Sequence, residues 1–350
     1  MRAARIPENG SVLLRLPNWA GDIVMSTPCI EAVRRERPDL AVTLAARRHL
    51  LPLLEEYPGI AGTIAIDGKS AADSWKFLGE VRRGKFSAIV VFAKGFRDGL
   101  IACLSGCPRR VGFGVNHRGF FFTDPVEMTE ALWNSHHALQ FAELIRPLGI
   151  SSEGTAPFLP SCGKNLDAAK DAVSSFGIEE KKFIALHIGA SKFPRAYHSE
   201  RFAEAAAEVN AGTGLKIVLI GTAEDRPYIE SFRKVFPACV DASGRIPLGI
   251  LPSFISLARL FVGSDSGPMH IASAVGTPVV AVFGPGSPAK TSPLLPEDRK
   301  RIVYSGLPCS PCRQRFFRDC APSPNGKPPC LELVTSGVLA GQILSLLEST

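Results

Sequence analysis

Residues 260–285 decide the fold of this chain; they read Leu-Phe-Val-Gly-Ser-Asp-Ser-Gly-Pro-Met-His-Ile-Ala-Ser-Ala-Val-Gly-Thr-Pro-Val-Val-Ala-Val-Phe-Gly-Pro. An apolar strand ends at Val262, and Pro268 stands where a helix begins, because its fixed φ suits the first helical position. Ser266 or Asp265 can cap that helix. A Gly-Thr-Pro turn ends it, and a second short apolar strand follows. The turn presents free N–H groups and the positive end of a helix dipole, which suits a phosphate or diphosphate. An ordinary βαβ unit, with Asp265 as a simple cap, would show the same residues.

The rest of the chain alternates apolar strands with segments of helical spacing. This alternation predicts an α/β fold with two Rossmann-like parallel-sheet domains. We expect an N-terminal domain at residues 1–160, a C-terminal domain at 165–335 and a last helix at 336–350. Because ligands bind at the carboxyl ends of parallel strands, the loops that begin at His187, Gly221, Gly244 and Asp265 should share one edge.

Composition restricts the class of protein. The chain has 350 residues, of which 45% are hydrophobic and 21% charged, and its net charge is +7. No uninterrupted apolar run predicts a membrane-spanning helix, and the first ten residues lack the apolar core of a signal peptide. We therefore expect a cytoplasmic protein, and nine cysteines fit a reducing compartment.

The stretch from Arg82 to Arg118 is strongly basic. It holds eight basic residues and one acid, Asp98. No RNA- or DNA-binding motif accompanies them, so a polyanionic glycolipid or a membrane surface is the expected partner, with no nucleic acid. A solvated surface would also explain several of these charges.

The first strand, Ser11 to Leu16, leads through a loop into a helix from Ile23 to Arg37. The loop contains Trp19-Ala-Gly-Asp22 and lacks the glycine pattern of a dinucleotide fingerprint. A carboxylate near a helix N-terminus stays ionised and can accept a proton from a hydroxyl group. Asp22 could equally cap the helix, and Trp19 could line a site or simply pack.

Four cysteines cluster near the C-terminus: Cys309, Cys312, Cys320 and Cys330. Such a set can hold zinc or iron in a tetrahedral thiolate site, which would be structural and not catalytic. The ten-residue separation of the last two weakens that hypothesis, and the alternative is a loop without metal.

The ordered run at 264–285 resembles the signature of glycosyltransferase family 9, the ADP-heptose:lipopolysaccharide heptosyltransferases. Trp-Ala-Gly-Asp at 19–22, His-Ile-Gly-Ala at 187–190 and Cys-Ser-Pro-Cys at 309–312 extend the resemblance over both domains. The resemblance implies the GT-B fold, in which two Rossmann-like domains face a central cleft. In this family the first domain binds an acceptor and the second binds a donor, so the resemblance implies an acceptor-binding domain at 1–160 and a donor-binding domain at 165–335. It also implies that the last helix, 336–350, crosses back to the first domain.

The resemblance also implies a donor site. Arg195 best matches the cation that contacts the diphosphate, with Lys192 as the other candidate, and either would replace a metal ion. Glu224 or Asp225 would approach the nucleoside sugar, and Ile246 would flank the adenine. The full implied donor set is His187, Gly189, Ala190, Ser191, Lys192, Glu224, Asp225, Ile246, Asp265, Ser266, Gly267, Pro268, Met269 and His270. His270 could instead be a satisfied helix histidine.

The implied reaction is inverting transfer of heptose from ADP-L-glycero-D-manno-heptose to the lipopolysaccharide inner core, with Asp22 as base and no cofactor required. The acceptor would be Kdo-lipid A or heptosyl-Kdo-lipid A, held by Trp19, Arg97 and Arg118. The Trp-Ala-Gly-Asp form favours the heptosyltransferase II type. The reaction would follow domain closure, with peripheral contact at the cytoplasmic face of the inner membrane. The alternatives are a family 9 enzyme with a protein or other polysaccharide acceptor, and a non-catalytic, metal-clipped binding protein on a GT-B scaffold.

Overall fold

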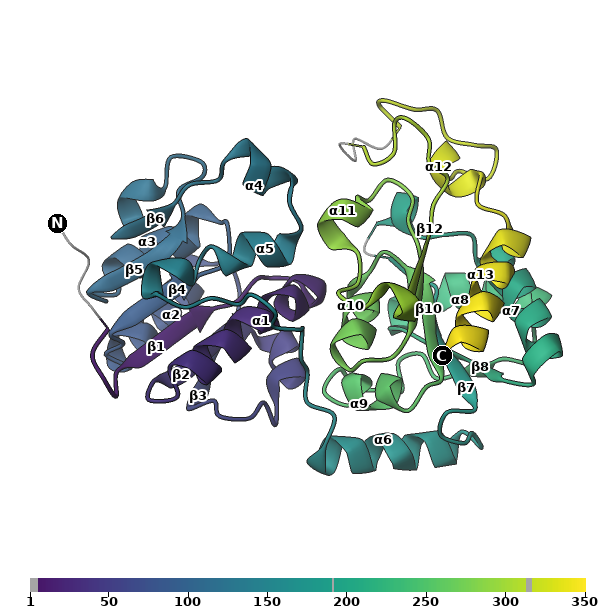
Figure 1. Ribbon diagram of the computed structural model, residues 1–350, viewed down its shortest axis with the longest axis horizontal. Coiled ribbons are helices and arrows are strands. Elements are labelled where there is room, and N and C mark those ends of the chain that lie inside the picture. The colour runs from purple at the N-terminus through teal and green to yellow at the C-terminus, as the bar shows by residue number, and fades with distance from the viewer. Residues whose placement is uncertain (1–5, 191, 313–316) are drawn as a thin grey trace. The chain divides into compact units, whose positions relative to one another are not determined.

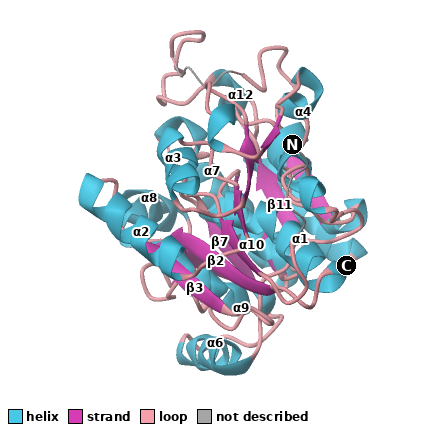
Figure 2. Ribbon diagram, turned by 90° about the vertical axis from the view of Figure 1, so that its left-hand side faces the viewer, coloured by secondary structure: helices cyan, strands magenta, loops and turns pink. Residues whose placement is uncertain are grey.

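The computed structural model describes residues 6–190, 192–312 and 317–350, and the chain divides into two compact units, Met1–Leu159 and Pro160–Thr350. Each unit is a six-stranded parallel sheet with helices on both faces (Figures 1 and 2). Within the described residues, no helix is both long enough and apolar enough to cross a membrane.

The first unit alternates strands and helices as the sequence predicts. Its elements are β1 (Ser11–Arg15), α1 (Ala20–Glu36), β2 (Ala41–Arg47), η1 (Arg48–Leu54), β3 (Gly62–Ile66), α2 (Ala71–Arg83), β4 (Ala88–Val91), α3 (Phe96–Leu104), β5 (Arg109–Phe113), η2 (Gly119–Phe121), β6 (Asp124–Val126), α4 (Glu130–Asn134), α5 (His137–Ala142) and η3 (Arg146–Leu148).

The strand order of this unit is β3-β2-β1-β4-β5-β6, and all neighbours are parallel. The order reverses between β1 and β4, where Leu14 pairs with both Leu44 and Val90. α2 and α3 cover one face over a core that includes Phe77 and Ile101. α1 and α5 pack against each other. The carboxyl ends of β1 and β4 are therefore the expected ligand position.

The second unit repeats this plan. Its elements are α6 (Gly163–Ser175), β7 (Phe183–His187), η4 (Phe193–Arg195), α7 (Ser199–Thr213), β8 (Lys216–Ile220), η5 (Ala223–Asp225), α8 (Arg226–Val235), β9 (Val240–Asp241), α9 (Leu251–Ser256), β10 (Leu260–Ser264), α10 (Gly267–Ala274), β11 (Val279–Val282), α11 (Pro288–Thr291), η6 (Glu297–Arg299), β12 (Lys300–Val303), α12 (Pro329–Glu332) and α13 (Ser336–Ser349).

Its strand order, β12-β11-β10-β7-β8-β9, is the same order when each sheet is counted from its own first strand. The reversal falls between β7 and β10, where Gly263 pairs with His187. The stretch that opens the sequence analysis thus forms β10, α10 and β11 beside the switch point of this sheet.

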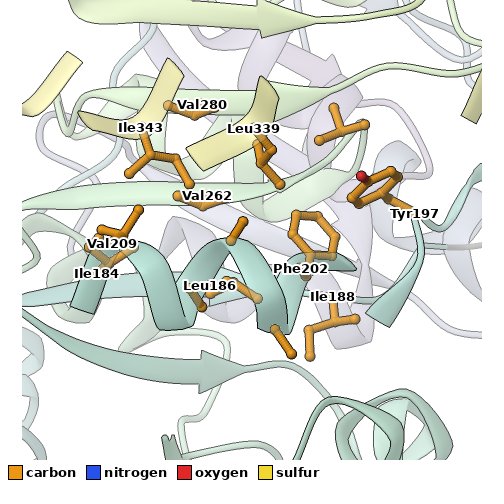
Figure 3. Packing of buried hydrophobic residues seen from close by; sticks show 14 of the residues in the cluster. Ile184, Leu186, Ile188, Tyr197, Phe202, Val209, Val262, Val280, Leu339 and Ile343 are labelled. Carbon is orange, nitrogen blue, oxygen red and sulfur yellow. The ribbon is translucent and has the colours of Figure 1, made fainter. Parts of the chain in front are cut away.

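The last helix, α13, packs on the sheet of the second unit. Leu339 and Ile343 lie beside Val262 and Val280 of the sheet and Phe202 of α7 (Figure 3). Val338, in the first turn of the same helix, is exposed. The expectation that residues 336–350 cross back to the first domain stays a prediction.

Two short strands were not predicted from the sequence, and both lie at sheet edges. β6 contains Pro125, which has no N–H for a ladder, and β12 opens with Lys300-Arg301. Edge strands tolerate both features because one side of the strand is unpaired. At α10 the helix begins at Gly267, one residue before Pro268, and Ser266 is its N-cap without a side-chain capping bond. Ser266, one of the two predicted caps, is therefore the N-cap residue, but its side chain does not form the predicted capping hydrogen bond.

Candidate active site

A pocket of about 370 Å³ opens at the carboxyl ends of β1 and β4 in the first unit. Asp22, in the first turn of α1, lines it together with Trp19 and Lys94. The remaining lining comes from the loops after both strands and from α5: Pro17, Asn18, Phe92, Ala93, Gly95, His137 and Phe141. The predicted base therefore lies at the switch point of the first sheet.

A buried ion pair lies at the end of β1, just before the loop that lines this pocket. Arg15, the last residue of β1, is 1% exposed, and its Nε donates to Asp98 Oδ1 at 2.9 Å. Burial lowers the pKa of the Arg15 guanidinium, and the charge of Asp98 opposes that shift. Arg15 Nη2 also donates to Asn18 Oδ1 at 2.7 Å, which holds the loop before Trp19 in place.

The carboxylate of Asp22 is half-buried and has a histidine neighbour. His137, the first residue of α5, places its Nδ1 3.4 Å from Asp22 Oδ1. The preceding His136 instead caps α5 by accepting a bond from the Ala138 N–H at 3.2 Å. An open carboxylate beside an imidazole at a helix N-terminus can take a proton from a hydroxyl group that enters the pocket.

The three predicted acceptor residues lie in three different environments. Trp19 is 68% exposed at the pocket. Arg97, on α3, donates to the Gly68 carbonyl at 3.0 Å and is half-buried. Arg118 is wholly buried and donates to the backbone carbonyls of Phe113, Gly95 and Ala93. The expectation that Arg118 contacts an acceptor is therefore wrong, because its guanidinium is buried and hydrogen-bonded to these backbone carbonyls.

Two residues of this pocket were not among the predicted site residues. Lys94 lies in the loop after β4, and its Nζ donates to Gln140 Oε1 at 2.9 Å and lies 5.5 Å from the Trp133 ring centroid. The other is His137, for which the sequence is compatible with either a surface position or an acceptor contact. The position of Lys94 just beyond an apolar strand next to β1 was the signal that could have found it.

In the second unit, β7 and β10 deliver two predicted donor residues to one place. His187 ends β7, and its Nδ1 lies 3.1 Å from the Ser266 hydroxyl at the start of α10. Burial lowers the pKa of the His187 imidazole, and the charge of Asp225 opposes that shift. The Ser266 hydroxyl lies beside His187 and makes no capping bond to α10. Gly267 begins the helix at the positive end of its dipole, whereas Pro268 has no N–H and the Met269 N–H donates to the Ser266 carbonyl at 3.2 Å.

Asp265 and Arg195 form the central charged pair of this unit. Arg195 Nη2 lies 2.5 Å from Asp265 Oδ2 and 3.1 Å from the Asp265 carbonyl. The Asp265 side chain is 6% exposed and that of Arg195 is 22% exposed. Gly286 is required beside them, because a Cβ there would overlap the carboxylate of Asp265. The pair fixes Arg195 at the entrance of α10, and among the described residues its buried Nε has no hydrogen-bond partner.

The structure separates the two acidic candidates of the next loop. Asp225 Oδ2 accepts from the Thr222 N–H at 2.8 Å and lies 3.9 Å from His187 Nε2. The carboxylate of Asp225 covers Gly189, where any side chain would overlap it. Glu224 is exposed. Asp225 therefore connects its own loop with the loop after β7. Glu224 is the exposed acidic side chain of the two, and a ligand can reach it.

The remaining donor candidates differ in their exposure. Lys192 is exposed at the start of η4, and Ala190 and Ile246 are half-buried. Pro268 lies in the first turn of α10. Met269 and His270 are buried in α10. Ser191 lies outside the described residues.

The four C-terminal cysteines do not form the expected metal site. Among the described residues, no group of three or more His, Cys, Asp or Glu side chains is placed to hold a metal ion. Cys309 and Cys312 are exposed, whereas Cys330 is buried in α12. Burial, together with the neighbouring thiols of Cys312, Cys320 and Cys309, raises the pKa of the Cys330 thiol to about 11.

Comparison with solved structures defines the fold class. A family 9 glycosyltransferase from Veillonella parvula matches with a TM-score of 0.85 at 21% identity, and the match covers 100% of both chains. The ADP-heptose lipopolysaccharide heptosyltransferase II of Escherichia coli matches with a TM-score of 0.79 at 20% identity, over 97% of this chain and 98% of that one. The two parallel-sheet units therefore have the GT-B fold.

Comparison with known sequences shows the family. Residues 74–318 match glycosyltransferase family 9, described as heptosyltransferase. A curated relative, lipooligosaccharide heptosyltransferase 2 of Haemophilus influenzae, is 24% identical over 84% of this chain and 88% of its own length. The chain belongs to glycosyltransferase family 9, and it is an enzyme of that class rather than a binding protein on a degenerate scaffold.

Proposed function

We propose that this enzyme transfers heptose, with inversion, from ADP-L-glycero-D-manno-heptose to the inner core of lipopolysaccharide. The observation that carries the proposal is the Asp22 carboxylate, which lines the pocket at the β1/β4 switch point with His137 3.4 Å away. Asp22 takes the proton of an acceptor hydroxyl. The new bond forms between that oxygen and C1 of heptose, and the bond from C1 to the diphosphate oxygen breaks and releases ADP.

The second unit binds the donor in this proposal. The diphosphate lies at the N-terminus of α10, where the helix dipole is positive and the N-cap residue Ser266 makes no side-chain capping bond. Arg195, fixed by Asp265, and the exposed Lys192 supply the positive charge that stabilises the leaving ADP. Glu224 meets the nucleoside sugar and Ile246 the adenine. Because cationic side chains and amides do this work, transfer is expected to persist in EDTA.

The heptosyltransferase II type is the favoured specificity. The Trp-Ala-Gly-Asp run at 19–22 supports it, as does the name of the Haemophilus influenzae relative. The acceptor would then be heptosyl-Kdo-lipid A, met by Trp19, with Arg97 nearby on α3. We place the reaction at the cytoplasmic face of the inner membrane, where such an acceptor is anchored.

The test is a transfer assay with purified enzyme, ADP-heptose, and a panel of Kdo-lipid A and heptosyl-Kdo-lipid A acceptors. ADP release and acceptor mass are followed together. We expect a mass increase of one heptose on heptosyl-Kdo-lipid A. Gain only on Kdo-lipid A would assign the first type instead. ADP-heptose binding without transfer to either acceptor would overturn the acceptor assignment and favour a protein or another polysaccharide.

A further inference from the structure

One side of α3 exposes a row of apolar side chains. Phe96, Leu100 and Leu104 are spaced four residues apart, so they lie along one face of the helix. Phe120, on η2, extends this face, because α3 and η2 are in contact. The exposed fractions are 58% for Phe96, 37% for Leu100, 39% for Leu104 and 72% for Phe120. These four residues are called the α3 face below.

The α3 face is not the side of the helix that folds against the sheet. Ile101 and Ala102, on the opposite side of α3, are buried in the core of the first unit. Phe121 is also buried, with its ring centroid 4.9 Å from that of Phe96 and 4.2 Å from that of Phe120. The exposed rings are thus held in place by a buried one, and the exposure does not come from loose packing.

The sequence stretch that contains α3 carries more basic than acidic residues. Asp98, the one acid between residues 82 and 118, is buried in its pair with Arg15. Arg82 is exposed and donates to the Leu104 carbonyl at 2.8 Å, which places its guanidinium at the end of the row. Lys85 is exposed as well, whereas Arg83 is partly neutralised by Glu80. An apolar face with a cationic border complements an anionic lipid surface.

The α3 face also begins at the acceptor pocket. Gly95 lines the pocket and Phe96 is the next residue along the chain. A glycolipid whose sugars enter the pocket therefore has its lipid anchor within reach of this face. From these observations we infer that the α3 face binds the surface of an anionic lipid bilayer. The inference deepens the proposed function, on which the identity of the lipid-anchored acceptor rests.

The test is flotation of the full-length enzyme with vesicles. We expect binding to vesicles that contain phosphatidylglycerol and at least tenfold weaker binding to pure phosphatidylcholine, because each basic residue near an anionic surface adds to the affinity. The double variant Phe96→Ser, Phe120→Ser should lose at least tenfold of the binding to the anionic vesicles. Its matched control is Leu333→Ser, Val338→Ser, which removes two exposed apolar side chains of the second unit, 59% and 53% exposed, and should bind like the wild type.

Three results separate the inference from its rivals. Equal binding by both double variants, or none by the wild type, would overturn it. A wild-type dimer that the Phe96→Ser, Phe120→Ser variant converts to a monomer, with vesicle binding unchanged, would assign the face to a second copy of the chain. Transfer to a water-soluble, deacylated acceptor should stay at the wild-type rate in this variant. Loss of that transfer with binding retained would count against the membrane role, whereas its absence in the wild type would count against the proposed function alone.

Discussion

The two units share one strand order, yet they use their switch points differently. At the β1/β4 point the carboxylate of Asp22 is open to a pocket and has an imidazole beside it. At the β7/β10 point the carboxylate of Asp265 is closed on Arg195, 2.5 Å away. In the proposed function, the same scaffold therefore presents a base in one unit and a fixed cation beside a helix N-terminus in the other. The difference is that the Asp265 carboxylate forms an ion pair with an arginine, whereas the Asp22 carboxylate lies beside a histidine.

The largest expected effect comes from removing the open carboxylate. Asp22→Asn should lower kcat by about 10²- to 10⁴-fold, because the amide cannot accept the acceptor's proton. Stopped transfer assays measured by ADP release would show it. The control is Asp73→Asn, which changes another first-turn aspartate that only caps its helix, α2, and should leave kcat unchanged. Equal rates for the wild type and Asp22→Asn would remove Asp22 from catalysis.

Opening the closed pair should have the next largest effect. Asp265→Asn leaves the Arg195 guanidinium without its charged partner in a nearly buried place, which should lower the free energy of unfolding by about 2 kcal/mol. Urea denaturation measures this loss. Glu230→Gln, which breaks the highly exposed pair with Arg226, should change little by comparison. Similar losses in both variants would contradict a structural role for the Asp265 pair.

The closure of the donor loops can be tested through a glycine. A methyl group at Gly189 would overlap the carboxylate of Asp225, so Gly189→Ala should cost about 1–3 kcal/mol of stability. It should also weaken ADP binding, since the loop after β7 must move. Gly212→Ala, in helix α7, is the matched control. Outside its own helix the new Cβ would meet only Leu344, at 4.0 Å, among the described residues. Thermal melts with and without ADP would show both effects, and an unaffected Gly189→Ala would mean that this contact is not required.

The smallest expected effect is a dependence of stability on pH. The pKa of His187 is lowered by burial from its ordinary 6.5, so the folded enzyme resists a proton that the unfolded chain accepts. Stability should therefore fall as the pH drops below 6.5, by at most about 1.4 kcal/mol per pH unit for this one group. His198, whose pKa burial also lowers, should add to the slope. His187→Gln should flatten the unfolding curve measured against pH, and an unchanged slope would contradict a buried neutral imidazole.

The sequence predicted the parts of the molecule that repeat a strong local pattern. The apolar strands of both sheet centres and the turn from Ser264 into α10 have such patterns, and all are present. The edge strands β6 and β12 were missed because a proline and two basic residues interrupt their apolar character. Both occupy edges, where those features cost little.

The sequence could not show which charged residues form hydrogen bonds or ion pairs with distant parts of the chain. Arg118 lies in a basic stretch, yet it is buried and donates to three backbone carbonyls, two of them 23 and 25 positions away in the sequence. The pairing of Asp265 with Arg195 and of Asp22 with His137 likewise joins residues 70 and 115 positions apart. Local spacing carries no information on such contacts, because only the folded sheet brings them together.

The most direct test of this division of work is the affinity for ADP, measured by calorimetry on the wild type, Asp22→Asn and Arg195→Ala. Asp22→Asn should bind ADP as the wild type does, because it changes only the base of the first unit. Arg195→Ala should bind at least tenfold more weakly, because a charge-assisted contact to the diphosphate is lost. Wild-type affinity in Arg195→Ala, or equal weakening in both variants, would contradict the account.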